Sequence, residues 1–446
     1  MEIALLSSET LDFDLIVIGD GSAGDNIART LGRKGMRVAL VENTHLGGEC
    51  LNDGCVPSKA LIDISRRAAA QGLSWREVVS RVEAIQLLVR GTDSDGGFAA
   101  DGVELFWGEA RFRAPKSVEV AGQVLNAKDI VIATGTAPSL PPIAGLAEAK
   151  PQTNRTIFGL PRFPAKLAVV GGGSIGLELG QSFLRLGSEV TIFEVGERIA
   201  ATEDVEVSLE LTKLLQRDGM RVETSAKIER VDRAENGSVT IETSNGRAIF
   251  DDLLVAAGRT PQVPGGLAEI GIERDERGYV SISPCGKTNV EGIWAAGDIT
   301  GKFQFTHYAS YQAHHIAKHI EQAACEPIPD TIVPWAIFTD PEVGHAGLTE
   351  QDARAAGVEI VVRRLDAADF DWFRTTSQPD GFAKVIVEAK TGVLIGAHFV
   401  CARGSTLVGE ACLAIQHGLT ARQVAETVHP YPTASELFRW TCASAV

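Results

Sequence analysis

A duplicated unit of strand, glycine-rich turn, helix, strand and acid constrains the fold of this chain more than any other feature of its sequence. The apolar run at residues 14–19 leads into the turn Gly19–Gly24, a helical stretch and a second apolar run that ends at Glu42. The same order recurs from residue 167, with the turn Gly171–Gly176 and the acid Glu194. The first glycine and the acid are 23 positions apart in both copies. Equal spacing in two copies predicts two βαβ units whose parallel strands are buried.

Each part of this unit suits the binding of a dinucleotide. The first glycine permits a tight turn, the second lets the backbone approach a pyrophosphate, and the third lets the helix pack against the strand. Free N–H groups at the helix N-terminus attract phosphates, and the acid accepts hydrogen bonds from ribose hydroxyls. Two such units predict a bound flavin and a diffusible nicotinamide dinucleotide. Glu194 favours NAD(H), because a carboxylate repels the 2′-phosphate of NADP, although Arg198 lies only four residues further on.

The net charge and the hydropathy of the chain argue against a nucleic acid or a membrane as a partner. The formal net charge is −16, and no Lys/Arg cluster offsets it, so we expect no nucleic acid or anionic membrane as a partner. No apolar run reaches the roughly 18 residues of a membrane span. Glu2, Glu9 and Asp12 stand where a signal peptide needs basic and then apolar residues. These features predict a cytoplasmic protein.

Two of the seven cysteines form a candidate redox pair. Cys50 and Cys55 are five positions apart, just before a helix that we expect to begin near Pro57. A helix N-terminus favours the reactive thiolate, and Lys59 would add positive charge one turn further on. In a cytoplasmic protein a catalytic pair is favoured over a structural disulfide.

The other cysteines and the histidines show no metal-ligand spacing, so no residue is assigned to a metal. Four cysteines lie among apolar or helical residues, and most of them are expected to be buried packing groups: Cys285, Cys325, Cys401 and Cys412. Cys442 remains ambiguous, as a free terminal cysteine or a mobile thiol that relays metal or electrons.

The segment GGECLNDGCVPSK, residues 47–59, resembles the active-site signature of the class I flavin-dependent pyridine nucleotide–disulfide oxidoreductases. Dihydrolipoamide dehydrogenase, glutathione reductase and mercuric reductase belong to this family. The resemblance extends over the whole chain through VIATGTAP, GLELG, AAGRTP, AAGDIT and FTDPEVGHAGLTE. The segment IGLELG and the acid that ends the second unit are more similar to dihydrolipoamide dehydrogenase than to the NADP-linked glutathione reductases.

The resemblance implies an α/β fold with two doubly wound dinucleotide-binding domains and an α+β C-terminal dimerisation domain. We expect an FAD-binding domain at 1–147, an NAD-binding domain at 148–272, a segment at 273–328 that completes the FAD domain, and an interface domain at 329–446. The implied cofactors are FAD and NAD(H), in a homodimer. The implied substrate is a small or protein-bound disulfide or dithiol, with a lipoyl group as one candidate.

Residue roles follow from the same resemblance. Cys55 would be the thiol beside the flavin and Cys50 the thiol that meets the substrate, with Lys59 near the flavin and paired with Glu178. Asp298 would contact the flavin side chain. The residues expected to bind the cofactors are Gly19, Gly21, Ser22, Ala23, Gly24, Glu42, Gly48, Lys59, Ala110, Thr134, Gly135, Gly171, Gly173, Ile175, Gly176, Glu194, Gly258, Gly297 and Asp298.

The C-terminal segment departs from the family pattern. The family has a histidine as acid/base and a glutamate five residues later, whereas this chain has Tyr431 and Glu436. Tyrosine has a pKa near 10, so only about one side chain in a thousand is a phenolate at pH 7. Either Tyr431 is strongly perturbed, His429 takes over the role, or the substrate is not an ordinary dithiol. Mercuric reductases also have tyrosine at this place.

The sequence is therefore compatible with three functions. The leading one is an NAD(H)-linked disulfide or dithiol oxidoreductase of the dihydrolipoamide dehydrogenase type, which passes electrons between NAD(H), FAD and the pair Cys50–Cys55. The second is a mercuric-reductase-like enzyme that reduces a thiol-bound metal or another electrophile. The third is a redox-sensing flavoprotein whose cysteine pair reports oxidation without turnover.

Overall fold

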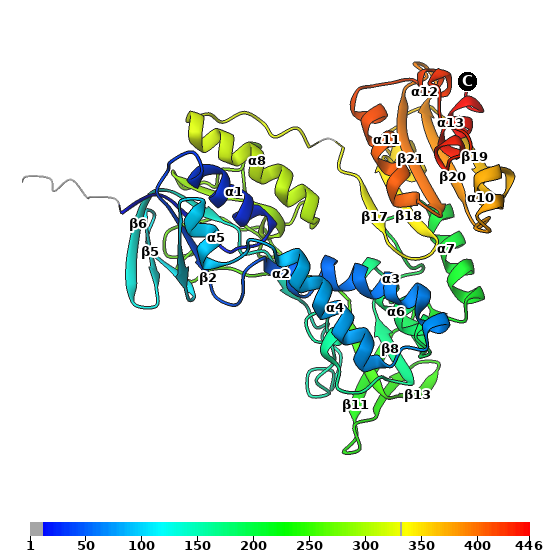
Figure 1. Cartoon of the computed structure of the whole chain (residues 1–446), viewed down its shortest axis with the longest axis horizontal. Helices are drawn as coiled ribbons and strands as arrows, with labels where there is room; N and C mark the ends of the chain where they lie inside the picture. The colour runs from blue at the N-terminus through cyan, green and yellow to red at the C-terminus, as the bar shows by residue number, and fades with distance from the viewer. Residues whose placement is uncertain (1–11, 331) are drawn as a thin grey trace, which may run out of the picture. The chain divides into compact units, whose positions relative to one another are not determined.

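The computed structural model describes residues 12–330 and 332–446, which divide into two compact units (Figure 1). Unit 1 comprises Met1–Val56, Ala84–Ala137 and Arg259–Pro329, and unit 2 comprises Pro57–Glu83, Pro138–Gly258 and Asp330–Val446. Most of the acidic N-terminal segment that suggested a cytoplasmic location lies outside the described residues, so that location stays a prediction. Among the described helices, none is both long and apolar enough to cross a membrane.

Unit 1 is built on a sheet whose strands run in the order β3-β2-β1-β6-β5-β4, with β16 paired to β6. The pairs β1–β2, β1–β6, β2–β3 and β6–β16 are parallel, whereas β4–β5 and β5–β6 are antiparallel. The strand bounds are β1 Phe13–Ile18, β2 Val38–Glu42, β3 Val103–Trp107, β4 Ala110–Ala114, β5 Ser117–Val120, β6 Gln123–Ile132 and β16 Ile293–Ala295.

Strand β1 has apolar side chains on both faces because both faces of the sheet are covered. Leu15 and Val17 pack with helices α1 (Ser22–Gly32) and α8 (Thr306–Gln322), which lie side by side (Figure 1). Ile16 and Ile18 pack on the opposite face, in a second cluster of buried residues. This explains why the strand reads as an unbroken apolar run in the sequence.

Most of the four scattered cysteines were predicted to be buried packing groups, and Cys285 does lie in the core, but it also forms a disulfide that the sequence did not predict. Cys285 and Cys325 form a disulfide across 40 positions of the chain, and Cys325 is exposed. Cys401 is fully buried and Cys412 half-buried, as expected for packing groups. Disulfide pairing depends on where the fold places two Cβ atoms, which cysteine positions alone do not reveal.

Unit 2 contains the second duplicated copy in a four-stranded parallel sheet of order β10-β9-β8-β14. An antiparallel sheet of order β11-β12-β13 accompanies it. The elements are β8 Lys166–Val170, α6 Ser174–Arg185, β9 Glu189–Phe193, α7 Val205–Arg217, β10 Arg221–Glu223, β11 Ile228–Arg233, β12 Val239–Thr243, β13 Gly246–Phe250 and β14 Asp252–Val255.

The C-terminal part of unit 2 is a five-stranded antiparallel sheet of order β17-β18-β21-β20-β19 with helices packed against it (Figure 1). Its elements are β17 Trp335–Ile337, β18 Glu342–Gly347, β19 Ile360–Asp366, β20 Phe382–Glu388, β21 Leu394–Cys401, α11 Gly404–Gln416, α12 Ala421–Glu426 and α13 Ser435–Ala443. Together with the parallel strands in the sheets of unit 1 and unit 2, this module confirms the predicted fold class.

Cys442 lies on α13 and is fully buried in the core of this module, against residues such as Leu437 and Phe438. Burial raises the pKa of its thiol. Cys442 is therefore a cysteine without a disulfide, as one alternative had it, and its burial and raised pKa make it too unreactive to be a mobile relay. The sequence left this point open because position near a chain end does not reveal burial.

Candidate active site

Two glycine-rich turns have the same geometry in the two copies. A Cβ at Gly24 would lie 1.8 Å from the Gly19 carbonyl oxygen, and one at Gly176 would lie 2.1 Å from the Gly171 oxygen. Only glycine therefore lets α1 and α6 approach the preceding strands so closely. By contrast, a Cβ at Gly21 or at Gly173 would meet no heavy atom of the described residues within 4 Å. The middle glycines thus border open space, where a pyrophosphate would need it.

The acid that ends each copy closes the turn of that copy. Glu42 accepts a hydrogen bond from the Asp20 backbone N–H at 3.0 Å, and Glu194 accepts one from the Gly172 N–H at 2.7 Å. The second oxygen of each carboxylate accepts a further backbone N–H, from Thr44 at 2.8 Å and from Gly196 at 2.7 Å. Both acids therefore organise the backbone of the turn in addition to any contact with ribose.

The position of Arg198 in the sequence weakened the prediction of NAD(H), but in the structure its side chain is hydrogen-bonded to backbone carbonyl oxygens. Its guanidinium donates to the carbonyl oxygens of Glu203 at 2.9 Å and Ala201 at 2.7 Å. Because these bonds hold the side chain, Arg198 is poorly placed to serve a 2′-phosphate.

Two buried polar atoms in unit 1 support the assignment of a cofactor to the first copy. Among the described residues, Asp20 Oδ1 and Thr134 Oγ1 have no hydrogen-bond partner. Buried polar groups without partners are rare in proteins and indicate an absent ligand or water. Asp20 lies in the first turn and Thr134 follows β6, so both belong to the segment predicted to bind FAD. Burial also raises the pKa of the Asp20 carboxyl to about 8.

The remaining predicted cofactor residues sit at the ends of elements. Gly48 lies so close to the first turn that its Cβ would approach Gly21 Cα to 2.5 Å. The others are placed as follows: Ser22 and Ala23 open α1, Ala110 opens β4, Gly135 follows β6, Ile175 lies in α6, Gly258 follows β14, and Gly297 and Asp298 open the short 3-10 helix Gly297–Thr300. Strand ends are where parallel sheets bind ligands.

A buried network around Asp298 was not foreseen from the sequence. Asp298 Oδ2 accepts from the Thr136 hydroxyl at 3.1 Å, and Arg259 donates to the same hydroxyl at 2.6 Å. Arg259 also forms an ion pair of 2.6 Å with Glu49, the residue before Cys50. Burial raises the pKa of Asp298, although Arg259 opposes that shift. The motif AAGRTP contains Arg259, but its partners become visible only in the fold.

The two cysteines lie on consecutive short and long helices. Cys50 is in α2 (Gly48–Asn52), and Cys55 is the first residue of α3 (Cys55–Gln71), two residues before the predicted start. Cys55 Sγ is 3.3 Å from the hydroxyl of Thr306, which opens α8. The Gln86 side chain donates to the carbonyl oxygens of Leu51 and Asn52 and so fixes the end of α2.

The electrostatics of the two thiols differ. A hydrogen bond with Cys55 and burial raise the pKa of the Cys50 thiol. The expectation that a helix N-terminus favours a thiolate is therefore not met by Cys50, while Cys55 stands at the N-terminus of α3 as predicted. The thiols of Cys50 and Cys55 lie within hydrogen-bond reach of each other. Such a pair has the proximity that disulfide formation requires.

Lys59 lies one turn beyond Cys55 on α3, as predicted, and pairs with Glu178. The Lys59 Nζ atom is 2.6 Å from Glu178 Oε2, and the carboxylate is almost completely buried. The other oxygen of Glu178 accepts the Phe338 backbone N–H at 2.9 Å. The predicted ion pair is therefore formed, and a fixed carboxylate orients the lysine.

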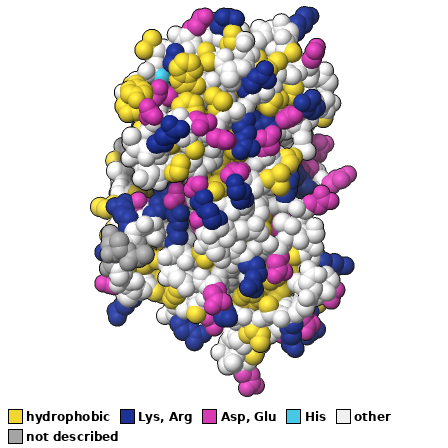
Figure 2. Space-filling model, turned by 90° about the vertical axis from the view of Figure 1, so that its right-hand side faces the viewer, with side chains coloured by type: hydrophobic (Ala, Val, Ile, Leu, Met, Phe, Trp, Pro, Cys, Tyr) yellow, Lys and Arg dark blue, Asp and Glu magenta, His cyan; other side chains and the backbone are white. Residues whose placement is uncertain are grey.

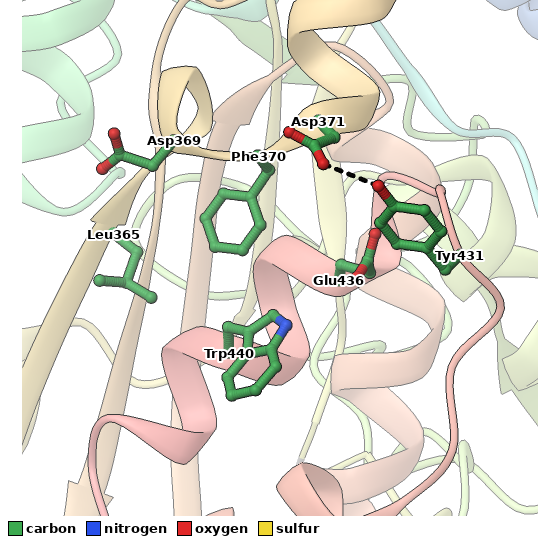
Figure 3. Close-up of a pocket in the computed structure, with 7 residues that line it drawn as sticks. All are labelled: Leu365, Asp369, Phe370, Asp371, Tyr431, Glu436 and Trp440. Carbon is green, nitrogen blue, oxygen red and sulfur yellow. Dashed lines mark hydrogen bonds between the residues drawn. The ribbon is translucent and has the colours of Figure 1, made fainter.

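Tyr431 and Glu436 line the same pocket of the C-terminal module, with a volume of about 450 Å³ (Figure 3). The Tyr431 hydroxyl points toward Asp371 and donates to its carboxylate at 2.7 Å. This hydrogen bond raises the pKa of Tyr431. The tyrosine is thus perturbed away from a proton acceptor, and it is a neutral hydrogen-bond donor at pH 7.

His429 does not join Tyr431 and Glu436 in that pocket. Its Nε2 atom is 2.7 Å from Glu410 Oε1, and its Nδ1 atom is 2.9 Å from the Thr427 carbonyl oxygen. The side chain is only 5% exposed. Both ring nitrogens are therefore engaged with acceptors within the same module, and neither is directed to a substrate.

Comparison with known proteins agrees with this geometry. Residues 13–313 match the family described as pyridine nucleotide-disulphide oxidoreductase, and residues 333–442 match the dimerisation domain of that family. The chain belongs to the pyridine nucleotide-disulphide oxidoreductase family. The oxidoreductase accordingly uses FAD and a pyridine nucleotide, and it carries the dimerisation domain of the family.

Relatives of the oxidoreductase cover nearly its whole length. It is 33% identical to a dihydrolipoyl dehydrogenase of Thermus scotoductus, over 95% of each chain. It is 32% identical to a mercuric reductase of Lysinibacillus sphaericus, over 97% of this chain and 82% of that one. The solved structure of the HOCl-induced flavoprotein disulfide reductase RclA from Escherichia coli matches with a TM-score of 0.90 and 27% identity, over 97% of this chain and 99% of that chain.

The raised pKa of Asp20 predicts that the stability of the protein depends on pH. Its carboxyl keeps a proton in the native state up to about pH 8, whereas the unfolded chain releases that proton near pH 4. The native state therefore binds more protons across this window, so stability falls as the pH rises from about 4 through 8. Asp20→Asn keeps an acceptor for the Gly47 N–H, which Asp20 binds at 2.8 Å, and it never ionises.

We expect wild type and Asp20→Asn to hold FAD equally at pH 6. Between pH 4 and pH 9 the wild type should lose on the order of 5 kcal/mol of stability that Asp20→Asn keeps, because the ionised carboxylate is buried. Thermal unfolding and flavin release from pH 5 to 9 measure the difference. Parallel pH profiles for the two proteins would show that Asp20 does not carry this proton.

Proposed function

We propose that the oxidoreductase reduces a disulfide with NADH and that Cys50 and Cys55 carry the exchange, as in enzymes of the dihydrolipoyl dehydrogenase type. The supporting observation is that the two thiols lie within hydrogen-bond reach of each other, next to the hydroxyl of Thr306. The net reaction is NADH + H⁺ + R–S–S–R → NAD⁺ + 2 R–SH, and it is reversible. FAD, when bound, supplies a carrier that accepts electrons from the nicotinamide and passes them on to a disulfide.

Roles for the site residues form part of this proposal. Cys50 attacks the substrate and Cys55 reacts on the flavin side, while the pair Lys59–Glu178 fixes a positive charge near the flavin ring. Residues 1–147 and 273–328 would hold FAD, and residues 148–272 would hold NAD. The Asp298–Arg259–Glu49 network is well suited to position the flavin side chain, because its carboxylates are half-buried and held by Thr136 and Arg259.

The proposal includes a preference for NADH over NADPH. Glu194 places a carboxylate at the end of β9, in the position that binds ribose in such units. Arg198, the nearest cation in sequence, is held by backbone carbonyl oxygens. A 2′-phosphate would therefore meet negative charge without a compensating partner.

The C-terminal module favours reduction of the substrate over its oxidation. Reduction of a disulfide needs a proton donor, which neutral Tyr431 is, whereas oxidation of a dithiol needs a base. A second candidate function is reduction of a soft metal ion held by thiolates, because Tyr431 stands where mercuric reductases also have tyrosine. In that reaction no substrate thiol has to lose a proton to a base.

A turnover panel tests the proposal and its alternative together. NADH and NADPH are each offered with lipoamide, glutathione disulfide and Hg(II), and kcat/KM is measured at pH 7. We expect NADH with lipoamide to be the best pair, and NADH to exceed NADPH at least about tenfold. Turnover of Hg(II) without turnover of either disulfide would establish the second candidate function. If NADPH with glutathione disulfide were the best pair, both candidate functions would be contradicted.

We also propose that the chain acts as a homodimer through the C-terminal module. Figure 2 shows apolar side chains in several patches on one face of the molecule. Within the module Leu413, Val428 and Trp440 are 58%, 92% and 46% exposed. The proposal is supported by the match of this module to the dimerisation domain of the family, whose partner would cover such apolar side chains.

A further inference from the structure

Three buried side chains meet in unit 2, outside the residues assigned to redox chemistry. Glu203 precedes α7, His345 lies in β18, and His398 lies in the adjacent strand β21. One potential ligand atom from each of the three lies within 4.8 Å of the others. Because the residues are far apart in the chain, their spacing gave no sign of the cluster.

In each of the three side chains, the polar atom that does not face the other two is held by a hydrogen bond to a neighbouring residue. The Trp335 indole N–H donates to Glu203 Oε1 at 2.6 Å. Nε2 of His345 lies 2.9 Å from the Gly347 carbonyl oxygen, and Nε2 of His398 lies 2.9 Å from the Leu348 carbonyl oxygen. A carbonyl oxygen only accepts, so each Nε2 carries the proton and each Nδ1 presents a lone pair.

The atoms of the three side chains that face one another lack a positive charge to balance them. Nδ1 of His345 lies 3.2 Å from Glu203 Oε2, which places a lone pair against a carboxylate oxygen. Nδ1 of His398, a residue with 0% exposure, has no hydrogen-bond partner among the described residues. A proton on His345 would satisfy the first pair but would leave His398 without a partner. A metal ion would satisfy all three atoms.

Lys384, a buried cation on the strand paired with β21, does not supply this charge. Its ammonium group is held by Asp204 at 3.0 Å, Glu206 at 3.1 Å and Glu350 at 2.7 Å. The indole of Trp335 stacks on His345 with ring centroids 3.5 Å apart, which fixes the orientation of the imidazole.

We propose that Glu203, His345 and His398 bind a divalent transition metal ion of the zinc type. Two imidazoles and one carboxylate are ligands that such ions prefer. Backbone carbonyls and an indole N–H hold the outer atoms, in the manner of the outer partners of known metal sites. With bonds of about 2.0–2.1 Å, the ligand atoms would have to draw closer than the 4.8 Å limit. The ion would tie the segment before α7 to the C-terminal sheet.

The test uses the full-length, FAD-containing protein with Cys50→Ser and Cys55→Ser, so that the redox thiols cannot bind the probe. The protein is stripped with a chelator, and Zn²⁺ alone is titrated against a competing dye. We expect about one equivalent of Zn²⁺ per chain. Glu203→Gln and His345→Gln in this background should each weaken binding about 100-fold or more.

His319→Gln is the matched control, because His319 is also buried and places a ring nitrogen 3.2 Å from a carbonyl oxygen, yet it lies in unit 1. Binding should be unchanged in this variant. The zinc X-ray absorption spectrum of the parent protein gives an answer even if a ligand variant fails to fold. A first shell of nitrogen and oxygen with imidazole scattering supports the site. Sulfur ligands, absence of uptake at 100-fold excess, or uptake that survives both ligand variants would overturn it.

Discussion

Cys55→Ser is expected to lower NADH-dependent disulfide reduction by about three orders of magnitude or more while FAD remains bound. A serine hydroxyl is not ionised at neutral pH and cannot form a disulfide with Cys50, so electrons have no route from the flavin to the substrate. FAD should stay because its phosphates depend on the turn Gly19–Gly24, which the substitution does not touch. Stopped-flow reduction by NADH, flavin absorbance and steady-state turnover measure the three properties.

Cys50→Ser should lose disulfide turnover as completely, but with a different spectrum. Cys55 would then be a free thiolate beside the flavin, and we expect absorption at wavelengths longer than the bands of the flavin itself. The matched control is Cys412→Ser in α11, because Cys412 is half-buried and takes no part in the exchange. Long-wavelength absorption in Cys55→Ser and not in Cys50→Ser would reverse the two roles.

Tyr431→His is expected to raise the oxidation of dihydrolipoamide at pH 7 about tenfold or more. In the wild type Tyr431 donates to Asp371, and this bond raises its pKa, so the tyrosine is a poor base. An imidazole with a pKa near 6.5 supplies the missing proton acceptor at neutral pH. The rate of NAD⁺ reduction by dihydrolipoamide, measured from pH 6 to 9, reports the change.

Two further variants make this prediction sharper. Tyr431→Phe should slow disulfide reduction, since it removes the proton donor, while His429→Ala should have little effect on either direction. His429 is held by Glu410 and Thr427, so loss of dithiol oxidation in His429→Ala would show that it acts as the base. If Tyr431→His left dithiol oxidation unchanged and destroyed Hg(II) reduction, the soft-metal function would be the better account.

Features encoded by short stretches of sequence were predictable. Both glycine turns, the acids Glu42 and Glu194, and the ion pair of Lys59 with Glu178 are present in the structure. The turns follow from local backbone constraints, since a Cβ at Gly24 cannot fit. The ion pair could be predicted only through the resemblance to a known family, because its members are more than a hundred positions apart.

Features that depend on burial and on distant pairing were missed. The Cys285–Cys325 disulfide, the burial of Cys442 and the cluster around Glu203 each arise when separate segments pack together. Cysteine and histidine have no periodicity that reveals a partner elsewhere in the chain. Arg198 illustrates the same limit, because the sequence places a cation near Glu194 but does not show that carbonyl oxygens already bind it.

The two acids that end β2 and β9 have a consequence for how mutant kinetics of this enzyme should be interpreted. Glu42 and Glu194 each use both carboxylate oxygens to hold backbone N–H groups before any nucleotide arrives. Substituting either acid would leave these N–H groups without acceptors and loosen the loop in the ligand-free enzyme. A higher KM in such a variant would therefore combine a lost ribose contact with the cost of reordering a disordered loop. Only the unfolding of the ligand-free variant separates recognition of the nucleotide from preorganisation of the site that receives it.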